Sequence, residues 1–400
     1  MKNWSSVALG DIFDISRGGS PRPIQNFITD DPDGINWIMI GDTSDSSRYI
    51  TSTKKRIMKS GVSKSRMVHP GDFLLTNSMS FGHPYIMKIS GCIHDGWLVL
   101  SAKKNNIDQN YFYHLLGSNN LYSEFSRRAA GTTVKNLNIN LVSGVKVNLP
   151  PLEEQKRIAA ILDKADSIRR KRKDAIALTE ELLRSTFLDM FGDPVTNPKG
   201  WEIKQLENLL AEPFQNGAYF PKEKYSTSNN SVEMVHMSDA FYGVVKTGHL
   251  KRVLATAEEI KKYEVITNDV LINRRSLNYE GAAKPCLIST LNGPLIFESS
   301  LIRVRVNQKV MDPIFFFSYM LQPQARAAFV FPFVTQSTIS GINQAGLKKI
   351  KVIVPPIDLQ LKYKQIYQKT TSSISNYKNN FDRTDNLFNS LLQKAFRGEL

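Results

Sequence analysis

The sequence has little of what marks secreted, membrane-spanning or zinc-binding proteins. Only two residues are cysteines, Cys92 and Cys286, and no CxxC pair accompanies them, so we expect neither a disulfide framework nor structural zinc. No apolar run reaches the length of about 18 residues that a membrane-spanning helix needs. The first residues, MKNWSSVALGDIFDIS, lack the apolar stretch of a secretory signal. These absences predict a cytoplasmic protein that does not insert into a membrane.

Recognisable catalytic motifs are also missing. No GxGxxG, GxxxxGK[ST] or HExxH motif occurs, and the 6 histidines are scattered. Two Glu-x-Lys triplets, Glu202–Lys204 and Glu259–Lys261, could form a magnesium-dependent nuclease site with Asp193 or Asp239. Such triplets arise by chance in a highly charged chain, and the internal repeat described below places Ser5–Val7 opposite residues 202–204. We therefore expect a non-catalytic chain with no metal or cofactor of its own.

The chain has a large excess of basic residues. It holds 52 Lys and Arg against 37 Asp and Glu, which gives a formal net charge of +15. Such an excess indicates a polyanionic partner, with nucleic acid first and an anionic membrane surface as the alternative. The basic block Arg169–Lys173 lies within a predicted helix. Both a solvated face with i,i+4 ion pairs and a contact with phosphate remain open for this block.

The sequence contains an internal repeat with a period of roughly 200 residues. PGDFLLTN (70–77) matches TNDVLINR (267–274), so that Asp72, which we predict to form a turn, recurs as Asp269. In the same order, WIMIGD matches MVHMSD, IDQNYFYHLL matches VMDPIFFFSYML, GTTVKNLN matches QSTISGIN, and NLPPLEEQ matches IVPPIDLQ. This order indicates that the whole unit has been duplicated.

Each copy consists of a globular part followed by a long helix. Short apolar runs broken by Gly, Asn, Ser and Pro predict strands in a mixed α+β domain of about 150 residues. After the Pro-Pro pair, 152–191 contains neither Pro nor Gly, and its apolar residues recur every three or four positions. A helix of this length is about 60 Å long and must bury its narrow apolar seam on a partner, for which the second copy is the candidate. The predicted boundaries are 1–150 and 193–355 for the domains, and 151–192 and 356–400 for the helices.

At LPPLEEQKRIAAIL…LLRSTFLDMFGDP, and again at VPPIDLQ…LLQKAFRGEL, the chain resembles the specificity subunit of Type I restriction–modification systems. The second match is looser, because Asp358-Leu359-Gln360 replaces Glu-Glu-Gln. The resemblance implies an α+β fold with two target recognition domains, separated by two helices that pack as an antiparallel coiled coil.

The same resemblance implies a function and a set of partners. It implies a non-catalytic reader of double-stranded DNA that docks two methyltransferase (modification) subunits. S-adenosylmethionine would be bound by those subunits, and ATP and magnesium by restriction subunits that join the complex.

Two basic domains on a rigid spacer should contact two patches of one duplex, about a helical turn of 34 Å apart. Because the copies have diverged, the two half-sites should differ. Base reading needs paired donors and acceptors, and phosphate contacts need Lys, Arg and hydroxyl groups. The polar loops of the first copy supply Arg17, Arg22, Asn77, Ser78, His83, Tyr85, Thr132, Thr133, Lys135 and Asn136.

The loops of the second copy supply Gln215, Asn216, Tyr219, Lys222, Arg274, Arg275, Asn278, Tyr279, Gln336, Ser337, Thr338 and Asn343. Of these, Arg274 and Arg275 are the strongest candidates, because two adjacent arginines leave an apolar strand and enter a glycine-containing loop. Arg172 interrupts the apolar seam of the first long helix and is a candidate for setting the register of the helix pair.

Overall fold

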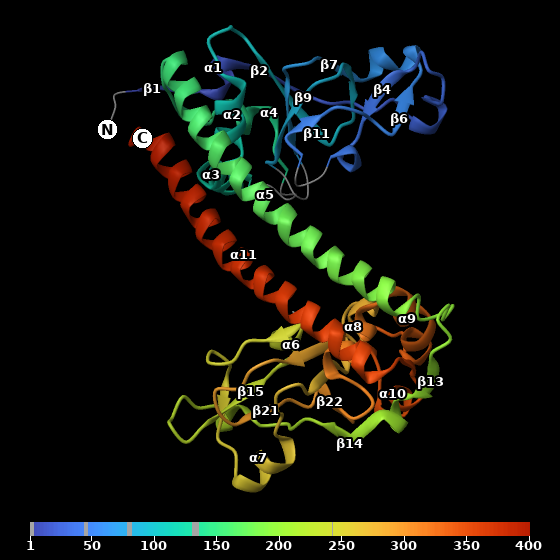
Figure 1. The fold of residues 1–400 in the computed structure, drawn as a ribbon. Coiled ribbons are helices and arrows are strands. Elements are labelled where there is room, and N and C mark those ends of the chain that lie inside the picture. Colours follow the sequence, from blue (N-terminus) through green and yellow to red (C-terminus); the bar gives the residue numbers. More distant parts are fainter. Residues whose placement is uncertain (1–3, 44–46, 78–81, 130–135, 242) are drawn as a thin grey trace. The chain divides into compact units, whose positions relative to one another are not determined.

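The computed structural model describes residues 4–43, 47–77, 82–129, 136–241 and 243–400, with only the helix backbone described for 374–383. The chain divides into two compact units, Met1–Ala175 with Tyr377–Leu400 (the first unit) and Ile176–Asn376 (the second unit). Two long helices, α5 (Leu152–Phe191) and α11 (Ile357–Arg397), are unbroken in Figure 1. Each unit therefore holds one mixed α/β domain and part of both long helices.

The first unit contains two five-stranded sheets and a separate strand pair. The main sheet has the order β2-β11-β8-β9-β5, the smaller sheet has the order β3-β6-β4-β10-β7, and β1 pairs with β12. The strands are β1 (Ser5–Ala8), β2 (Phe13–Arg17), β3 (Ile28–Thr29), β4 (Ile35–Ile38), β5 (Tyr49–Ile50), β6 (Lys55–Ile57), β7 (Arg66–Val68), β8 (Phe73–Thr76), β9 (Pro84–Met87), β10 (Gly91–Ile93), β11 (Trp97–Ala102) and β12 (Lys146–Leu149). The short helices are α1 (Leu9–Ile12), α2 (Gln109–Leu116), α3 (Asn119–Ala129) and α4 (Ile139–Ser143).

The second unit repeats this plan. Its main sheet has the order β14-β22-β18-β20-β16, its smaller sheet the order β17-β15-β21, and β13 pairs with β24 as β19 does with β23. The strands are β13 (Glu202–Gln205), β14 (Leu210–Asn216), β15 (Val232–Val235), β16 (Val244–Val245), β17 (Arg252–Val253), β18 (Val270–Asn273), β19 (Arg275–Ser276), β20 (Pro285–Ile288), β21 (Leu295–Phe297), β22 (Leu301–Val306), β23 (Ser340–Gly341) and β24 (Lys351–Val354). The short helices are α6 (Met237–Ala240), α7 (Ala257–Tyr263), α8 (Pro313–Leu321), α9 (Pro323–Ala325) and α10 (Gln344–Lys348).

The carboxylates predicted to form turns do so at the same place in both copies. Asp72 accepts a hydrogen bond from the backbone N–H of His69 at 2.7 Å, and Asp269 accepts one from Ile266 at 2.8 Å. Each carboxylate thus closes the turn that leads into a buried strand of the main sheet, β8 or β18. The prediction is confirmed, and it places the two copies in the same alignment that the sequence matches gave.

A buried glutamine explains the Pro-Pro…Gln motif. The Gln360 side chain accepts a hydrogen bond from the backbone N–H of Asp312 at 2.8 Å, and it donates to the carbonyls of Pro355 at 2.8 Å and Val310 at 3.0 Å. Gln155 makes the corresponding three bonds in the first unit, to Asp108, Pro150 and Asn106. Each glutamine therefore fixes the start of a long helix to the segment that enters α2 or α8.

Each unit buries one part of both long helices in its largest hydrophobic core. In the first unit, Ile158 and Leu162 of α5 share a core with Phe388 and Ala395 of α11. In the second unit, the end of α5 meets the start of α11, where Phe187 and Tyr363 have ring centroids 5.5 Å apart. Within both units, the two helices therefore run in opposite directions past one another.

The apolar seam is less buried toward the middle of α5 than the periodicity predicted. Ile168 is 43% exposed and Leu182 55%, because in the structure the domain cores cover the ends of the helix. Arg172, the candidate for setting the register, donates from Nη1 to the Thr384 hydroxyl of α11 within the first unit. Among the described helices, none is long and apolar enough to cross a bilayer.

Candidate nucleic-acid interface

Two of the predicted DNA-contacting loops meet in the second unit. Strand β19, which contains Arg275, pairs with β23, so that Arg275 lies opposite Gly341. The backbone N–H of Ile342 donates to the Arg274 carbonyl at 3.0 Å. Gly341 is needed here, since an added Cβ would lie 2.9 Å from the same carbonyl oxygen. The result is a hollow of about 340 Å³, lined by Arg274, Arg275, Thr335, Ser337, Ile339, Gly341, Ile342 and Asn343.

A third predicted loop joins this hollow through an amide pair. Gln344 Nε2 donates to Asn216 Oδ1 at 3.1 Å, and the Gln215 side chain donates to the Asn216 carbonyl at 2.9 Å. The Asn343 side chain caps α10 by accepting from Gly346 N–H at 2.8 Å, so its oxygen already has a structural partner. Gln336 and Thr338 are exposed on the loop before β23. The structure therefore brings residues of three candidate loops together around Arg274 and Arg275.

A buried arginine that sequence reasoning missed supports the neighbouring loop. Arg326, which is 8% exposed, donates to the carbonyls of Glu280 and Ala282, both at 2.8 Å, and also to those of Ala283 and Met320. Burial lowers the pKa of Arg326. In the sequence this arginine stands between alanines and resembles any solvated helix residue, so no local signal distinguishes it.

The loop that Arg326 supports carries two of the predicted site residues. The Tyr279 hydroxyl donates to the Phe331 carbonyl at 3.1 Å, and the two rings lie 4.9 Å apart. Asn278, by contrast, is exposed. Tyr279 is therefore engaged in holding the loop, while Asn278 presents its amide at the surface.

A second hollow surrounds the exposed Tyr219, whose exposed fraction is 82%. It has a volume of about 840 Å³ and is lined by Tyr219, Phe220, Lys222, Tyr225, Ser226, Thr227, Lys251 and Arg252. Aromatic rings beside lysine and arginine suit both stacking on bases and contacts with phosphate. Lys251 and Arg252 were missed, although two adjacent basic residues in the sequence are a usable signal.

In the first unit, an aspartate that sequence reasoning missed, Asp95, contacts several predicted residues through its backbone carbonyl and its carboxylate. Arg17 Nε donates to the Asp95 carbonyl at 3.1 Å, Asn77 Nδ2 donates to the same oxygen at 2.8 Å, and Arg22 lies 3.9 Å from the Asp95 carboxylate. A hydrogen bond from the Ser20 hydroxyl, at 2.7 Å, lowers the pKa of Asp95. An ionised aspartate at such a surface can accept a hydrogen bond from the amino group of cytosine.

Not all predicted residues of the first unit lie at the surface. Asn77 is 2% exposed, and Tyr85, at 7%, packs edge-on against Trp97 with ring centroids 5.7 Å apart. These two buried side chains therefore support the loops from the interior of the domain. His83 is exposed and Asn136 is half-buried. Ser78, Thr132, Thr133 and Lys135 lie outside the described residues.

The residues of the hypothetical nuclease site have structural partners. Lys204 pairs with Glu202 at 3.0 Å on β13, and Glu259 closes a capping box with Thr256 at the start of α7. Asp239 accepts from the His236 backbone N–H at 2.9 Å. Within the described parts of the chain, no group of three or more His, Cys, Asp or Glu side chains could hold a metal ion.

The two candidate surfaces share one backbone frame. Leu137 N–H donates to the Asn77 carbonyl at 2.9 Å in the first unit, just as Ile342 N–H donates to the Arg274 carbonyl in the second. Gly18 and Gly217 occupy corresponding positions, and a Cβ at either would lie 2.0 or 2.2 Å from the carbonyl oxygen of His94 or Glu298. The same frame therefore carries different side chains in each copy. Asn77 is buried and donates to the Asp95 carbonyl, whereas Arg274 at the matching position lines the hollow of the second unit.

Comparisons with known proteins agree with this duplication. The sequence matches the family model described as Type I restriction modification DNA specificity domain, over residues 1–178 and again over 198–380. It is 22% identical to the Type I restriction enzyme MjaIX specificity subunit of Methanocaldococcus jannaschii, over all of this chain and 94% of that protein. It is also 22% identical to the EcoKI specificity subunit of Escherichia coli K12, over all of this chain and 89% of the relative.

Solved structures show the same fold. The S subunit of a Type I restriction–modification system from M. genitalium superposes with a TM-score of 0.53 at 16% identity, covering 98% of this chain and 96% of that one. A chain from a structure of the type I R-M system superposes with a TM-score of 0.52 at 18% identity, covering 99% and 98%. These structures and the tandem family match confirm the predicted fold class of two similar domains with a long helix between them. Because the family model matches well over half of the chain, the protein belongs to the specificity subunits of Type I restriction–modification systems, the non-catalytic components that recognise the DNA sequence.

Proposed function

We propose that this chain reads a two-part, asymmetric DNA site, with one half bound by each domain. The observation that carries the proposal is the shared backbone frame with exchanged side chains, in which Asn77 and Arg274 occupy the same position. The exposed polar side chains around this position differ between the copies: Arg17, Arg22 and His83 in the first unit, and Arg275, Asn278 and Thr338 in the second. Two frames of this kind, both in basic domains, bind one duplex at two places and select different bases there.

In this proposal, α5 and α11 are the spacer that fixes the gap between the half-sites. Each helix runs through both compact units and is anchored at its start by a buried glutamine, Gln155 or Gln360. A continuous helix of this length is stiff, and the cores of both units hold it at its ends. The gap is therefore a property of the helices and of how each domain is fastened to them.

The same helices dock the partner subunits. Each unit leaves large apolar side chains exposed on them, Ile168 and Leu387 in the first unit and Leu178 and Leu182 in the second. Exposed apolar side chains on a helix are typical of a protein interface. We assign this surface to two methyltransferase subunits, which bind S-adenosylmethionine and methylate adenine within the bound site. Where restriction subunits are present, they bring the ATP- and magnesium-dependent activities, and the complex works in the cytoplasm on double-stranded DNA.

The test is to express this chain with the methyltransferase subunit from the same genome and to map methylated adenines by long-read sequencing. We expect one motif made of two unlike half-sites separated by a fixed number of unspecified base pairs. The methyltransferase subunit expressed alone is the control and should leave this motif unmodified. A continuous motif, a palindrome, or methylation without sequence preference would contradict the proposal.

A further inference from the structure

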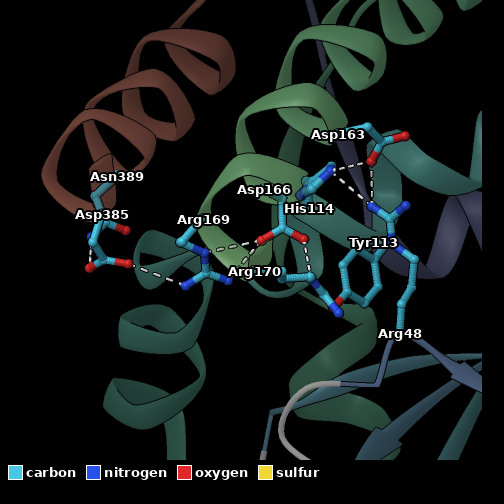
Figure 2. A network of polar contacts seen from close by, with 9 residues as sticks. All are labelled: Arg48, Tyr113, His114, Asp163, Asp166, Arg169, Arg170, Asp385 and Asn389. Atoms are coloured by element: carbon cyan, nitrogen blue, oxygen red, sulfur yellow. Dashed lines mark hydrogen bonds and ion pairs between the residues drawn. The ribbon is translucent and has the colours of Figure 1, made fainter. Parts of the chain in front are cut away.

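A buried cluster of charged and polar groups fastens the first domain to α5 (Figure 2). Arg48, next to β5, donates from Nη2 to Asp163 of α5 at 2.6 Å. The same nitrogen lies 2.9 Å from Nε2 of His114 in α2, which is itself 2.8 Å from the Asp163 carboxylate. Three segments that are distant in the sequence thus converge on one carboxylate.

The cluster is partly shielded from water. The exposed fraction of the side chain is 13% for Arg48, 3% for His114 and 31% for Asp163. The Arg48 guanidinium also lies over the Tyr113 ring, 4.2 Å from its centroid. Burial lowers the pKa of His114, although its hydrogen bond with Asp163 opposes that shift. The planar guanidinium of Arg48 donates to one half-buried carboxylate, so the contact favours a particular direction as well as a distance.

The contacts continue from α5 to the second long helix. One turn beyond Asp163, Asp166 binds Arg170 at 2.7 Å and Arg169 at 2.8 Å. Arg170 donates to the Tyr113 hydroxyl at 3.2 Å, and Arg169 reaches Asp385 of α11 at 3.3 Å (Figure 2). The first domain, α5 and α11 are therefore joined within the first unit by ion pairs, hydrogen bonds and the contact of Arg48 with the Tyr113 ring. Arg169 and Arg170, the first two residues of the basic block 169–173, therefore form ion pairs within the protein.

The second copy lacks the arginine at the corresponding position. The Arg48 carbonyl accepts from Ile86 N–H at 2.9 Å, and in the second copy the Gly243 carbonyl accepts from Leu287 N–H at 2.8 Å. These matched bonds place Gly243, which has no side chain to offer, where Arg48 stands.

The second copy also has other residues at the positions of His114 and Asp163. His114 lies six residues beyond the aspartate that caps α2, and Ser318 lies six residues beyond the one that caps α8. Asp163 lies eight residues beyond the buried glutamine of α5, and Gln368 lies eight beyond that of α11. In the second unit, the helices are held by aromatic packing of the kind that Phe187 makes and by an ion pair between Lys364 of α11 and Asp312 at 3.1 Å. The Lys364 ammonium is a point charge on a flexible stem, whereas the planar guanidinium of Arg48 fixes the direction of its hydrogen bonds.

We propose that the Arg48–His114–Asp163 cluster is a positioning device that fixes the first domain on the spacer helices and so restricts the gap between half-sites to one length. The inference rests on the proposed function, because a gap exists only for a two-part site. A gap one base pair longer moves the half-site by about 3.4 Å and turns it by about one tenth of a helical turn. If the first domain is held rigidly on the helices, it cannot follow a half-site that is displaced in this way. Without the cluster, the domain can rotate on the helices and bind the displaced half-site.

The experiment uses the complex of the full chain with its methyltransferase subunit and a pool of duplexes. Each duplex carries both half-sites, separated by the wild-type gap or by a gap one or two base pairs shorter or longer. In Arg48→Met, we expect methylation at the neighbouring gap lengths to rise roughly tenfold or more relative to wild type, while the half-site sequences stay unchanged. Asp163→Asn keeps an acceptor but removes the charge, and should broaden the gap in the same direction.

The matched control is Arg127→Met, because Arg127 is an exposed arginine of the same unit whose ion pair with Glu124 stays within α3. It should leave the gap as narrow as in wild type. Thermal melting identifies any variant that fails to fold, in which case the other variant of the cluster decides the result. If both variants fold and still methylate only duplexes with the wild-type gap, at a reduced or an unchanged rate, the inference is overturned. If wild type itself shows no two-part motif, the proposed function fails instead.

Discussion

The buried glutamine at the start of each long helix gives the sharpest test of how the fold is held together. Gln360 is 0% exposed, and its amide satisfies three backbone groups, the N–H of Asp312 and the carbonyls of Pro355 and Val310. Gln360→Ala leaves all three without a partner. Each unsatisfied buried group costs about 1–3 kcal/mol, so the expected loss of unfolding free energy is about 4 kcal/mol. For a unit of this size, that corresponds to a melting temperature lower by roughly 10 °C.

The assay is chemical unfolding of the full chain, combined with hydrogen exchange to assign the loss to the second unit. The backbone amides of α8 and of the start of α11 should exchange faster in Gln360→Ala, while those of the first unit keep wild-type rates. Gln365→Ala is the matched control, because Gln365 is exposed on the same helix, and we expect it to change stability by less than about 0.5 kcal/mol.

Gln360→Glu separates hydrogen bonding from packing. The carboxylate keeps nearly the same volume and can still accept from the Asp312 N–H, but it cannot donate to the two carbonyls that Gln360 now satisfies. We expect a loss comparable to that of the alanine variant. Wild-type stability in Gln360→Glu, or a loss below about 1 kcal/mol in Gln360→Ala, would refute the argument that these three bonds fasten the helix.

Three further predictions concern DNA. The affinity of the methyltransferase complex for DNA should fall on the order of a thousandfold between about 50 and 200 mM salt in a gel-shift series, and salt-independent binding would exclude phosphate contacts as the main attraction. Arg275→Ala should relax one base position in one half-site of the methylation motif, whereas uniform weakening at all positions would make Arg275 a phosphate contact. Inserting seven residues into both α5 and α11, after Ala175 and Asn376, lengthens each helix by about 10 Å and should lengthen the preferred gap by about three base pairs. An unchanged gap in the methylome of that variant would contradict the spacer role.

The parts of the structure that could be predicted are those encoded by neighbouring residues. The Pro-Pro pair, the absence of Pro and Gly after it and the apolar periodicity placed both long helices. The order of matched segments predicted the duplication, and the turn-forming role of Asp72 and Asp269 followed from local chemistry. The resemblance to specificity subunits, the recognition of DNA and the non-catalytic role were confirmed by the tandem family match and the curated relatives.

The parts that could not be predicted depend on contacts between distant residues. Asn77 ends an apolar strand and enters a polar loop, as a surface residue would, but its amide turns inward to the Asp95 carbonyl. Asp95 itself stands in an Asp-Gly sequence that indicates only a turn. Arg326 is surrounded by carbonyls from a loop more than 40 residues away. No periodicity or spacing reports such pairings, because they arise only when the strands are placed side by side.

The duplicated frame suggests why the two copies could diverge at their surfaces while keeping one fold. Some bonds that hold the candidate loops, such as that from Ile342 N–H to the Arg274 carbonyl, join backbone groups, whereas others are made by side chains such as Arg326 and Tyr279. The bonds that start the long helices are made by the side chains of Gln155 and Gln360, which both copies retain. Exposed loop residues such as Asn278 and Thr338 can therefore change without loss of these bonds, whereas substitution of either glutamine removes three of them.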